Sequence, residues 1–336
     1  MPRSRSVVTV LAVVAAVASI GFAGHSITAG PSPATPGEPS PAAGSEGPAA
    51  APPGWRWEVY ENVQVQVPAA WTWDLFAGLA KCTLRPEPEP VVRRPGGALI
   101  GDPGGACRAE RPIPIDRQPS LEFDGGWLPG RSQYPAGWVR ETRLVGELPV
   151  TVFARDAALR ERILSSAGVV GAVDGNGCEP VSALAVDKVV RPPSQGGLKS
   201  VGTVESVSLC EYSTSVRPDD PWPLTASSLL RGQAAAKLVR DLVAAPPGTG
   251  PTLTDQRVCG PDPGFPVIVL RVRGSAHNQD VLYRYSGCRT NGTDDGSVQR
   301  QLTSATARQI FLGAHQLYGK SNVLYQLLIG TPPPVV

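Results

Sequence analysis

The sequence predicts an α+β protein in which antiparallel sheets carry helices on one face. Two observations lead to this class. Stretches in which apolar and polar residues alternate, typical of half-buried strands, are followed by stretches with apolar residues at helical spacing. The region between Cys178 and Tyr318 also shows one pattern twice, which we interpret as a duplicated strand-strand-helix unit. The chain of 336 residues is long enough for two domains together with targeting and linker segments.

Composition divides the chain into segments. We expect an export signal or membrane anchor at 1–29, a Pro/Ala/Gly/Ser linker at 30–54, an N-terminal α+β domain at 55–175, a duplicated strand-strand-helix domain at 176–320, and a C-terminal segment and tail at 321–336. The first segment has Arg3 and Arg5 before an apolar run from Val7 to Ala23 that contains no charge. This run is either a signal that is cleaved or a single membrane span, and both place the body outside the cytoplasm.

In the N-terminal domain, alternation predicts the strands. From Trp57 to Val67, apolar residues alternate with polar residues at every second position. This pattern predicts a half-buried strand, and Pro68 is expected to end it. Gly137–Val145 and Leu148–Phe153 are predicted as further strands. Asp156 is expected to cap a helix, because its carboxylate can accept hydrogen bonds from the first backbone N–H groups.

The duplicated domain is predicted from matching landmarks. Each copy begins with Cys-x-Pro, has a second cysteine after a β-rich stretch, and has a Leu-Thr pair 14 residues after that cysteine. We expect each Leu-Thr pair to open a helical run, the first ending at Val243 and the second at Tyr318. The strands are expected at Val181–Val190, Val201–Tyr212, Pro266–Val272 and Val281–Ser286.

Six cysteines that follow an export signal predict disulfides rather than free thiols. Each bridge would stabilise the fold by about 3 to 4 kcal/mol by restricting the unfolded chain. Pairing within each copy, with the remaining two cysteines joined to each other, predicts Cys178–Cys210, Cys259–Cys288 and Cys82–Cys107.

Charge and motifs exclude several functions. The net charge of +2 comes from 31 basic and 29 acidic residues without a basic cluster, so nucleic acid is not an expected partner. The sequence contains no P-loop, no Gly-x-Gly-x-x-Gly after a strand, and no closely spaced Cys/His pairs, so no cofactor or metal is predicted. Asn291–Gly296 begins like an EF-hand loop, but Leu302 stands where that loop needs Glu, which favours a polar turn.

No catalytic pair is evident among the polar residues. His25 falls in the signal or linker region, and His277 and His315 are interpreted as structural or solvent-exposed. A Gly-x-Ser-x-Gly elbow is lacking. The sequence therefore predicts a protein that is not an enzyme. A cluster of tryptophans near the start forms a candidate ligand platform if exposed and core if buried, and we favour core: Trp55, Trp57, Trp71 and Trp73.

Several stretches together resemble exported proteins of actinobacteria that have no assigned activity: Gly54–Glu58, Asn62–Pro68, Asp156–Ser166 and Tyr285–Gly296. The resemblance spans Trp55 to Tyr318 and implies a location in the cell envelope, without functional residues to transfer. We expect an extracytoplasmic envelope protein that binds an unknown ligand or protein and that contacts the membrane through its N-terminal segment if this segment is not cleaved. A secreted hydrolase without a recognisable motif and a structural envelope component are the alternatives. A pocket lined by tryptophan would favour binding, and a convergent Asp/Glu/His cluster would favour an enzyme.

Overall fold

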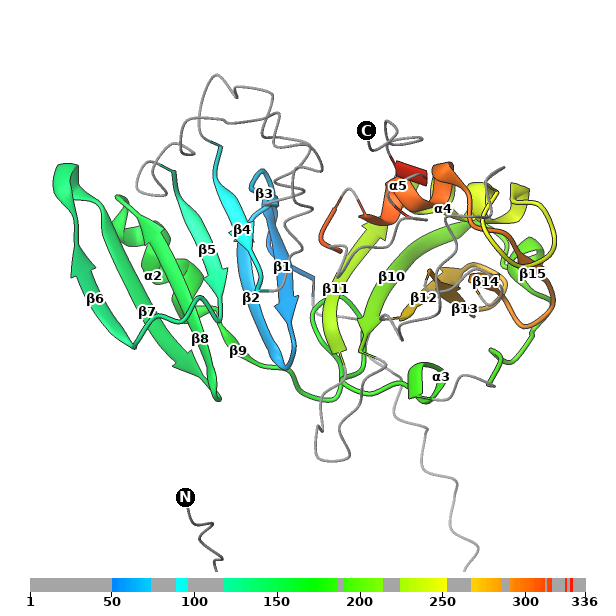
Figure 1. Cartoon of the computed structure of the whole chain (residues 1–336), viewed down its shortest axis with the longest axis horizontal. Coiled ribbons are helices and arrows are strands. Elements are labelled where there is room, and N and C mark those ends of the chain that lie inside the picture. Colours follow the sequence, from blue (N-terminus) through cyan, green and yellow to red (C-terminus); the bar gives the residue numbers. More distant parts are fainter. Residues whose placement is uncertain are drawn as a thin grey trace, which may run out of the picture. The chain divides into compact units, whose positions relative to one another are not determined.

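Two sheets, connected by short helices and loops, form the framework of the protein (Figure 1). The computed structural model describes residues 50–73, 89–95, 118–186, 190–213, 224–252, 267–285, 291–311, 313–315, 324 and 327–328. The fold is α+β with mostly antiparallel sheets and few helices, which confirms the predicted class.

The larger sheet has nine strands, and every neighbouring pair in it is antiparallel. Its order is β15 (Gln299–Arg300), β14 (Gly292–Asp294), β13 (Gln279–Arg284), β12 (Val267–Gly274), β10 (Val204–Tyr212), β11 (Leu224–Arg231), β1 (Trp55–Tyr60), β2 (Val63–Pro68) and β9 (Gly168–Val169). Strands from both sides of the predicted boundary between residues 175 and 176 therefore share one sheet.

The smaller sheet has six strands and mixed direction. Its order is β3 (Thr72–Trp73), β4 (Val91–Arg93), β5 (Ser120–Phe123), β8 (Leu148–Ala154), β7 (Val139–Val145) and β6 (Gly130–Gln133). The pairs β3–β4 and β4–β5 are parallel, and the others are antiparallel. Its apolar side chains, among them Val92, Leu121 and Val150, share a core with Val65 of β2 and with Ile163.

The strand predicted from Trp57 to Val67 is a hairpin of β1 and β2. The chain turns at Glu61, whose φ of 50° lies in the left-handed region. After this turn, even-numbered residues of β1 lie on the same face of the sheet as odd-numbered residues of β2. Glu58 therefore pairs with Val65 and shares its buried face. Val65 is fully buried as predicted, but Glu58, expected on the polar side, is also fully buried.

The helices pack as their apolar stripes predict. α4 (Gly232–Ala244) and α5 (Ser304–Phe311) cover one face of the larger sheet and share a core with β10, β12 and β13. α2 (Ala157–Ser165) begins after Asp156, whose carboxylate accepts hydrogen bonds from two backbone N–H groups, as expected. The opposite face of the larger sheet carries α3 (Ala183–Val186) beside the Cys178–Cys210 disulfide.

The two predicted copies differ in structure, and the duplication is not confirmed. The strand expected at Val181–Val190 is wrong, because the described part of this range contains α3. Leu224 opens strand β11 rather than a helix, since pairing on both sides by β10 and β1 outweighs its helical pattern. Leu302, by contrast, precedes α5, where Thr303 accepts a hydrogen bond from the Thr306 N–H as the predicted N-cap.

The Cys178–Cys210 disulfide is present as predicted, with Cα atoms 5.5 Å apart. The cysteines of the other two predicted bridges lie outside the described residues: Cys82, Cys107, Cys259 and Cys288. The predicted anchor or signal at 1–29 also lies outside them, as does the linker before Ala50. Among the helices within the described ranges, none is both long and apolar enough to cross a membrane.

Candidate functional site

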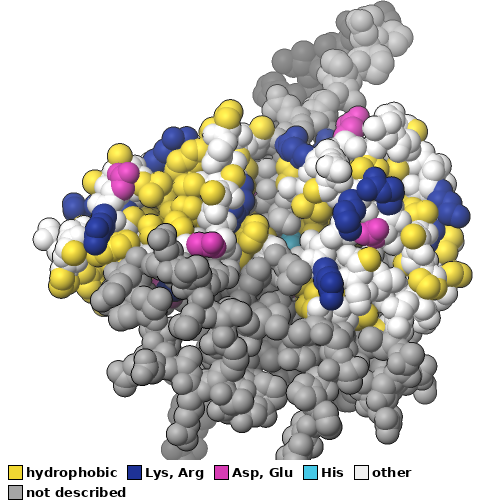
Figure 2. Space-filling view, turned by 90° about the horizontal axis from the view of Figure 1, so that it is seen from above, with side chains coloured by type: hydrophobic (Ala, Val, Ile, Leu, Met, Phe, Trp, Pro, Cys, Tyr) yellow, Lys and Arg dark blue, Asp and Glu magenta, His cyan; other side chains and the backbone are white. Residues whose placement is uncertain are grey.

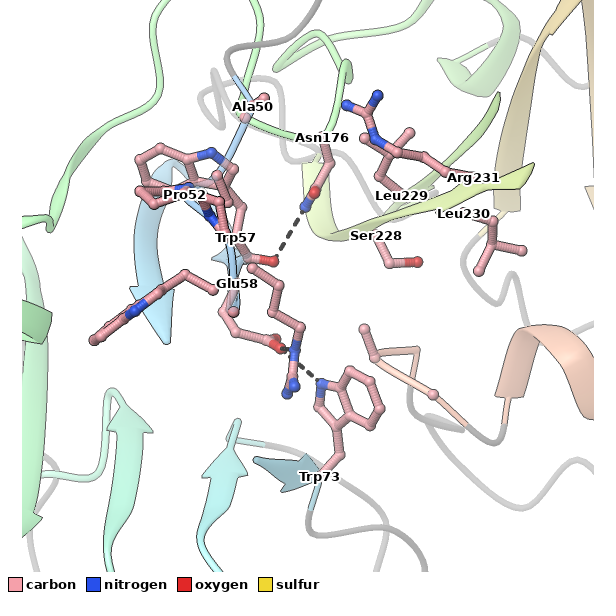
Figure 3. A pocket seen from close by; sticks show the side chains of 18 of the residues that line it. Ala50, Pro52, Trp57, Glu58, Trp73, Asn176, Ser228, Leu229, Leu230 and Arg231 are labelled. Atoms are coloured by element: carbon pink, nitrogen blue, oxygen red, sulfur yellow. Dashed lines mark hydrogen bonds and ion pairs between the residues drawn. The ribbon is translucent and has the colours of Figure 1, made fainter. Parts of the chain in front are cut away.

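A cavity of about 410 Å³ lies where β1 and β11 separate (Figure 3). The two strands pair at Val59–Ser227 and Tyr60–Ala226. Beyond these pairs, residues 55–58 of β1 and residues 228–231 of β11 become opposite walls of the cavity. Ile310 and Ala314, at and after the end of α5, contribute to its lining.

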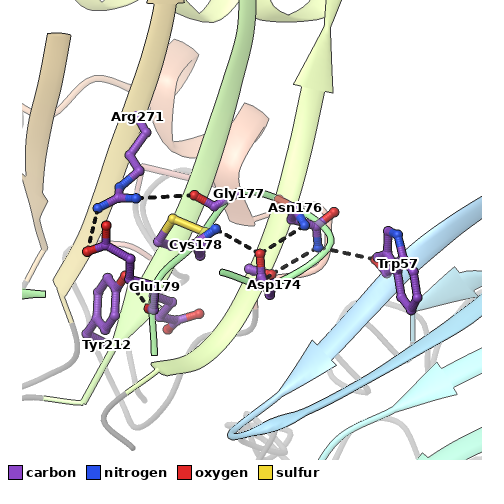
Figure 4. The surroundings of a disulfide bond; sticks show 12 residues. Trp57, Asp174, Asn176, Gly177, Cys178, Glu179, Tyr212 and Arg271 are labelled. Carbon is purple, nitrogen blue, oxygen red and sulfur yellow. Dashed lines mark hydrogen bonds and ion pairs between the residues drawn. A yellow bond between two sulfur atoms is a disulfide. The ribbon is translucent and has the colours of Figure 1, made fainter. Parts of the chain in front are cut away.

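The loop from Asp174 to Cys178 bridges the point of separation. The Asn176 side-chain amide donates to the Trp57 carbonyl of β1 at 3.4 Å and to the Ser227 hydroxyl of β11 at 2.9 Å (Figure 4). Ser227 in turn donates to Asp174 at 2.5 Å. Burial raises the pKa of Asp174, although the hydrogen bonds it accepts act in the other direction. The disulfide at Cys178 thus anchors a polar loop that joins the two strands at the floor of the cavity.

Ser228 forms a hydrogen-bonded chain with a histidine and a glutamate. Its hydroxyl lies 2.9 Å from His315 Nε2, and His315 Nδ1 lies 3.0 Å from Glu211 Oε2. Glu211 and His315 are fully buried, whereas Ser228 is half-buried and lines the cavity. A serine, a histidine and a carboxylate in this order are the arrangement that activates a serine hydroxyl for nucleophilic attack.

The sheet and the end of α5 bring these residues together. Glu211 pairs with Ala226 and Leu209 pairs with Ser228, so Glu211 and Ser228 are diagonal neighbours on the helix-covered face. A bulge lies next to Glu211, a feature that often orients side chains at functional sites. The Tyr285 hydroxyl donates to the second oxygen of Glu211 at 3.0 Å, so both carboxylate oxygens have partners.

An ion pair in the interior supports the segment that carries His315. Arg94, just after β4, donates to the Ala314 carbonyl and pairs with Glu58 at 2.7 Å. The side chains of Arg94 and Glu58 are each only 1% exposed. Glu58 also accepts from Trp73 Nε1 at 2.9 Å and from Arg56 Nε at 2.6 Å, which compensates its burial. The cavity wall and the His315 segment are therefore coupled through Arg94.

The candidate ligand platform divides between the cavity and the core. Trp55, Trp57 and Trp73 line the cavity, whereas Trp71 is 5% exposed and packs in the core of the smaller sheet. The Trp57 ring packs on Gly175, where a Cβ atom would approach Trp57 Cδ1 to 2.3 Å. Binding of a ligand by the three cavity tryptophans stays a prediction.

The remaining polar candidates have other roles. His277 is half-buried in the loop between β12 and β13. In the EF-hand-like segment, Asp294 pairs with Arg191 at 2.8 Å and Asp295 pairs with Arg300 at 3.0 Å, so their charges are matched by arginine. Within the described part of the chain, no group of His, Cys, Asp and Glu could hold a metal ion. On the face shown in Figure 2, acidic and basic side chains are interspersed.

Sequence reasoning missed the chain of Ser228, His315 and Glu211. The sequence predicts His315 to be structural or solvent-exposed; it is buried, in agreement with the first alternative, and it also lies within hydrogen-bonding distance of a serine on a cavity wall. Glu211 offered one signal, because it is an acidic residue between Cys210 and Tyr212 in an otherwise apolar strand end. Ser228 carried none.

Comparison of the chain with protein-family models, with curated proteins and with solved structures finds no match. The geometry of the site is therefore the basis for a functional proposal.

Proposed function

We propose that this protein is an extracytoplasmic hydrolase that uses Ser228 as its nucleophile. His315 acts as the general base, and Glu211 orients the imidazole and stabilises its charged form. The observation that carries the proposal is the continuous chain of hydrogen bonds, 2.9 Å from Ser228 to His315 and 3.0 Å from His315 to Glu211. With Nδ1–H donating to Glu211, His315 Nε2 is free to accept the serine proton.

The reaction that this arrangement supports is acyl transfer. Ser228 Oγ forms a bond to a carbonyl carbon while its proton passes to His315 Nε2. The bond from that carbon to the leaving oxygen or nitrogen then breaks, and His315 returns the proton to the leaving group. A water molecule attacks the acyl-serine in the same way, giving the acid and regenerating Ser228.

Exposure on one side distinguishes this arrangement from an ordinary buried histidine. A structural histidine is satisfied by any two buried partners. Here Glu211 and His315 are sealed in the interior, whereas Ser228 is half-buried and reaches the wall of the 410 Å³ cavity. This volume falls within the range of about 300 to 1,000 Å³ that is typical of small-molecule sites. A substrate, and later the attacking water, could thus reach the Ser228 hydroxyl and His315 Nε2 from the cavity, whereas Glu211 lies behind them in the interior.

Ester hydrolysis tests this proposal. We expect the protein to hydrolyse p-nitrophenyl butyrate, and Ser228→Ala to lower the rate by at least about a thousandfold, the loss typical of removing a nucleophile. Ser165→Ala is the matched control, because Ser165 is an exposed serine on α2 whose hydroxyl bonds only to helix carbonyls among the described residues. Equal rates for all three proteins would contradict the proposal.

The tryptophans on the cavity support a second candidate, a binding protein without catalysis. Trp55 and Trp73 line the cavity, pack against the core of the smaller sheet, and carry arginine guanidinium groups over their rings at 3.8 Å and 4.1 Å, respectively. Such rings suit an apolar or sugar ligand. Ligand-dependent quenching of tryptophan fluorescence together with full ligand recovery after incubation would favour this function over hydrolysis.

A location outside the cytoplasm is part of the proposal. The Cys178–Cys210 disulfide and the charged and apolar N-terminal segment support it. Mass spectrometry of protein from the envelope fraction would test it, because the mature N-terminus shows whether the segment is cleaved. Recovery of the protein from the cytosol with reduced Cys178 and Cys210 would contradict it.

A further inference from the structure

The wall of the cavity beside Ser228 is the edge of a strand. Glu61 N–H bonds to the Thr225 carbonyl at 3.3 Å, in the same register that pairs Val59 with Ser227. In an antiparallel pair, residues that direct their backbone groups toward one neighbour recur at every second position. The backbone N–H and C=O groups of Thr225 and Ser227 point toward β1. Those of Leu229 and Arg231, two and four residues after Ser227, therefore point to the same side.

On that side β1 no longer pairs with β11. Continued in the same register, Trp57 would pair with Leu229 and Trp55 with Arg231. The described pairing ends at Val59, and the Trp57 carbonyl accepts its hydrogen bond from Asn176 instead. The backbone edge of Leu229 and Arg231 therefore faces the cavity, next to Ser228.

We propose that the substrate is a peptide that binds in an extended conformation as an added strand along this edge, with its scissile carbonyl at Ser228. The inference rests on the proposed hydrolase function and names its substrate class. Strand addition to an exposed sheet edge is a common mode of peptide recognition, because the main-chain hydrogen bonds fit any sequence. A lipid chain or a sugar cannot complete the alternating N–H and C=O pattern of Leu229 and Arg231.

The position of Leu229 agrees with peptide-bond cleavage. Its N–H follows the nucleophile directly and faces the cavity, which is the place that the first oxyanion donor takes in many serine hydrolases. In the resulting reaction Ser228 Oγ bonds to the peptide carbonyl carbon, the C–N bond breaks, and His315 delivers the proton to the departing amine. Water then releases the acid from the acyl-serine.

The two faces of the gap predict the side chains of the peptide. Leu230 and Ile310 lie on the helix-covered side, whereas Trp57 and Leu229 lie on the other. The lining of the cavity as a whole is more apolar than polar, and successive side chains of an extended peptide point to opposite faces. We therefore expect a preference for apolar residues on both sides of the cleaved bond.

Protection of Ser228 from a fluorophosphonate probe tests this inference. The competitor is a blocked peptide of alternating alanine and leucine, together with variants N-methylated at one position each. We expect the parent peptide to slow labelling, and N-methylation to weaken this protection about tenfold at every second residue, because only those N–H groups bond to β11. Equal effects at all positions, or protection by octanoate or chitotriose but not by the peptide, would overturn it.

Amide hydrogen exchange separates this inference from the hydrolase proposal. We expect the peptide to slow exchange at Leu229 and Arg231 in both the unmodified protein and Ser228→Ala, because strand addition does not need the hydroxyl. If exchange slows but the probe does not label the protein, strand addition is supported and the hydrolase proposal is refuted. Labelling of Ser228 without slowed exchange would refute the peptide and retain the hydrolase.

Discussion

At the scale of single residues, the site depends on where charge is buried. Glu211 lies in the interior with hydrogen bonds from Tyr285 and His315 to its two oxygens. In the proposed reaction, its negative charge favours the imidazolium that would form when His315 takes the serine proton. Under the proposed function, the carboxylate acts mainly by stabilising this charged form in the transition state.

Replacing Glu211 by Gln tests this role. The variant keeps the size of the side chain and the hydrogen bond that it accepts from Tyr285 but removes the charge, so we expect unfolding stability within about 1 kcal/mol of the unmodified protein. Ester hydrolysis should fall by about a thousandfold or more, as when the carboxylate of a serine triad is neutralised. Kinetics across pH 5 to 9 and urea unfolding of the same samples would measure both. Unchanged hydrolysis would show that Glu211 has only a structural role.

The ion pair of Arg94 with Glu58 predicts a loss of stability. Arg94→Leu leaves the Glu58 carboxylate buried with fewer partners and removes the donor to the Ala314 carbonyl, so we expect a cost of about 3 kcal/mol. Urea unfolding would measure it. In the double variant with Glu58→Gln the unpaired charge is gone, and part of the loss should return. Additive losses in the double variant would contradict the coupling.

At the scale of elements, the hydrogen bonds of the turn between β14 and β15 predict a pH dependence. Burial acts to raise the pKa of Asp295, but hydrogen bonds from Ser297, the Val298 N–H and Arg300 outweigh it and lower the pKa from 3.8 to about 2. A lowered folded pKa stabilises the protein above 3.8, and this contribution disappears as the pH falls toward 2. After screening we expect about 1 kcal/mol, absent in Asp295→Asn. Urea unfolding of both proteins through this range would test it, and parallel pH curves would contradict it.

The Cys178–Cys210 bridge joins the loop at the floor of the cavity to β10. It closes a separation of 32 residues, so we expect its removal in Cys178→Ala/Cys210→Ala to cost about 3 to 4 kcal/mol. Guanidinium unfolding under oxidising conditions would measure the loss. If the unmodified protein in reductant is as stable as under oxidising conditions, the bridge does not contribute as described.

The elements also show what the sequence can predict. The Asp156 and Thr303 caps and the buried stripes of α4 and α5 were predicted, because they depend on neighbours a few residues apart. The hairpin at Glu61 was missed, since period-two alternation is the same in one strand or two. This error hid Glu58, whose place in the core follows from the turn rather than from its own parity.

At the scale of the whole molecule, the site is assembled from distant parts of the chain. His315 lies 104 residues from Glu211 and 87 from Ser228 in sequence, and Arg94 is 220 residues from the carbonyl it holds. No local pattern encodes such proximity. β11 was predicted as the start of a helix, and only its insertion between β10 and β1 places Ser228 on the cavity. The site could therefore not be read from the sequence.

The proposal that Ser228 is an activated nucleophile is tested most directly by locating a covalent adduct. The protein is treated with a fluorophosphonate, digested, and analysed by peptide mass spectrometry. We predict one adduct, on Ser228. His315→Gln should carry no adduct although it is folded, which a cooperative unfolding transition would show. A protein that stays unlabelled, or that carries the adduct on another serine with Ser228 unmodified, would contradict the account.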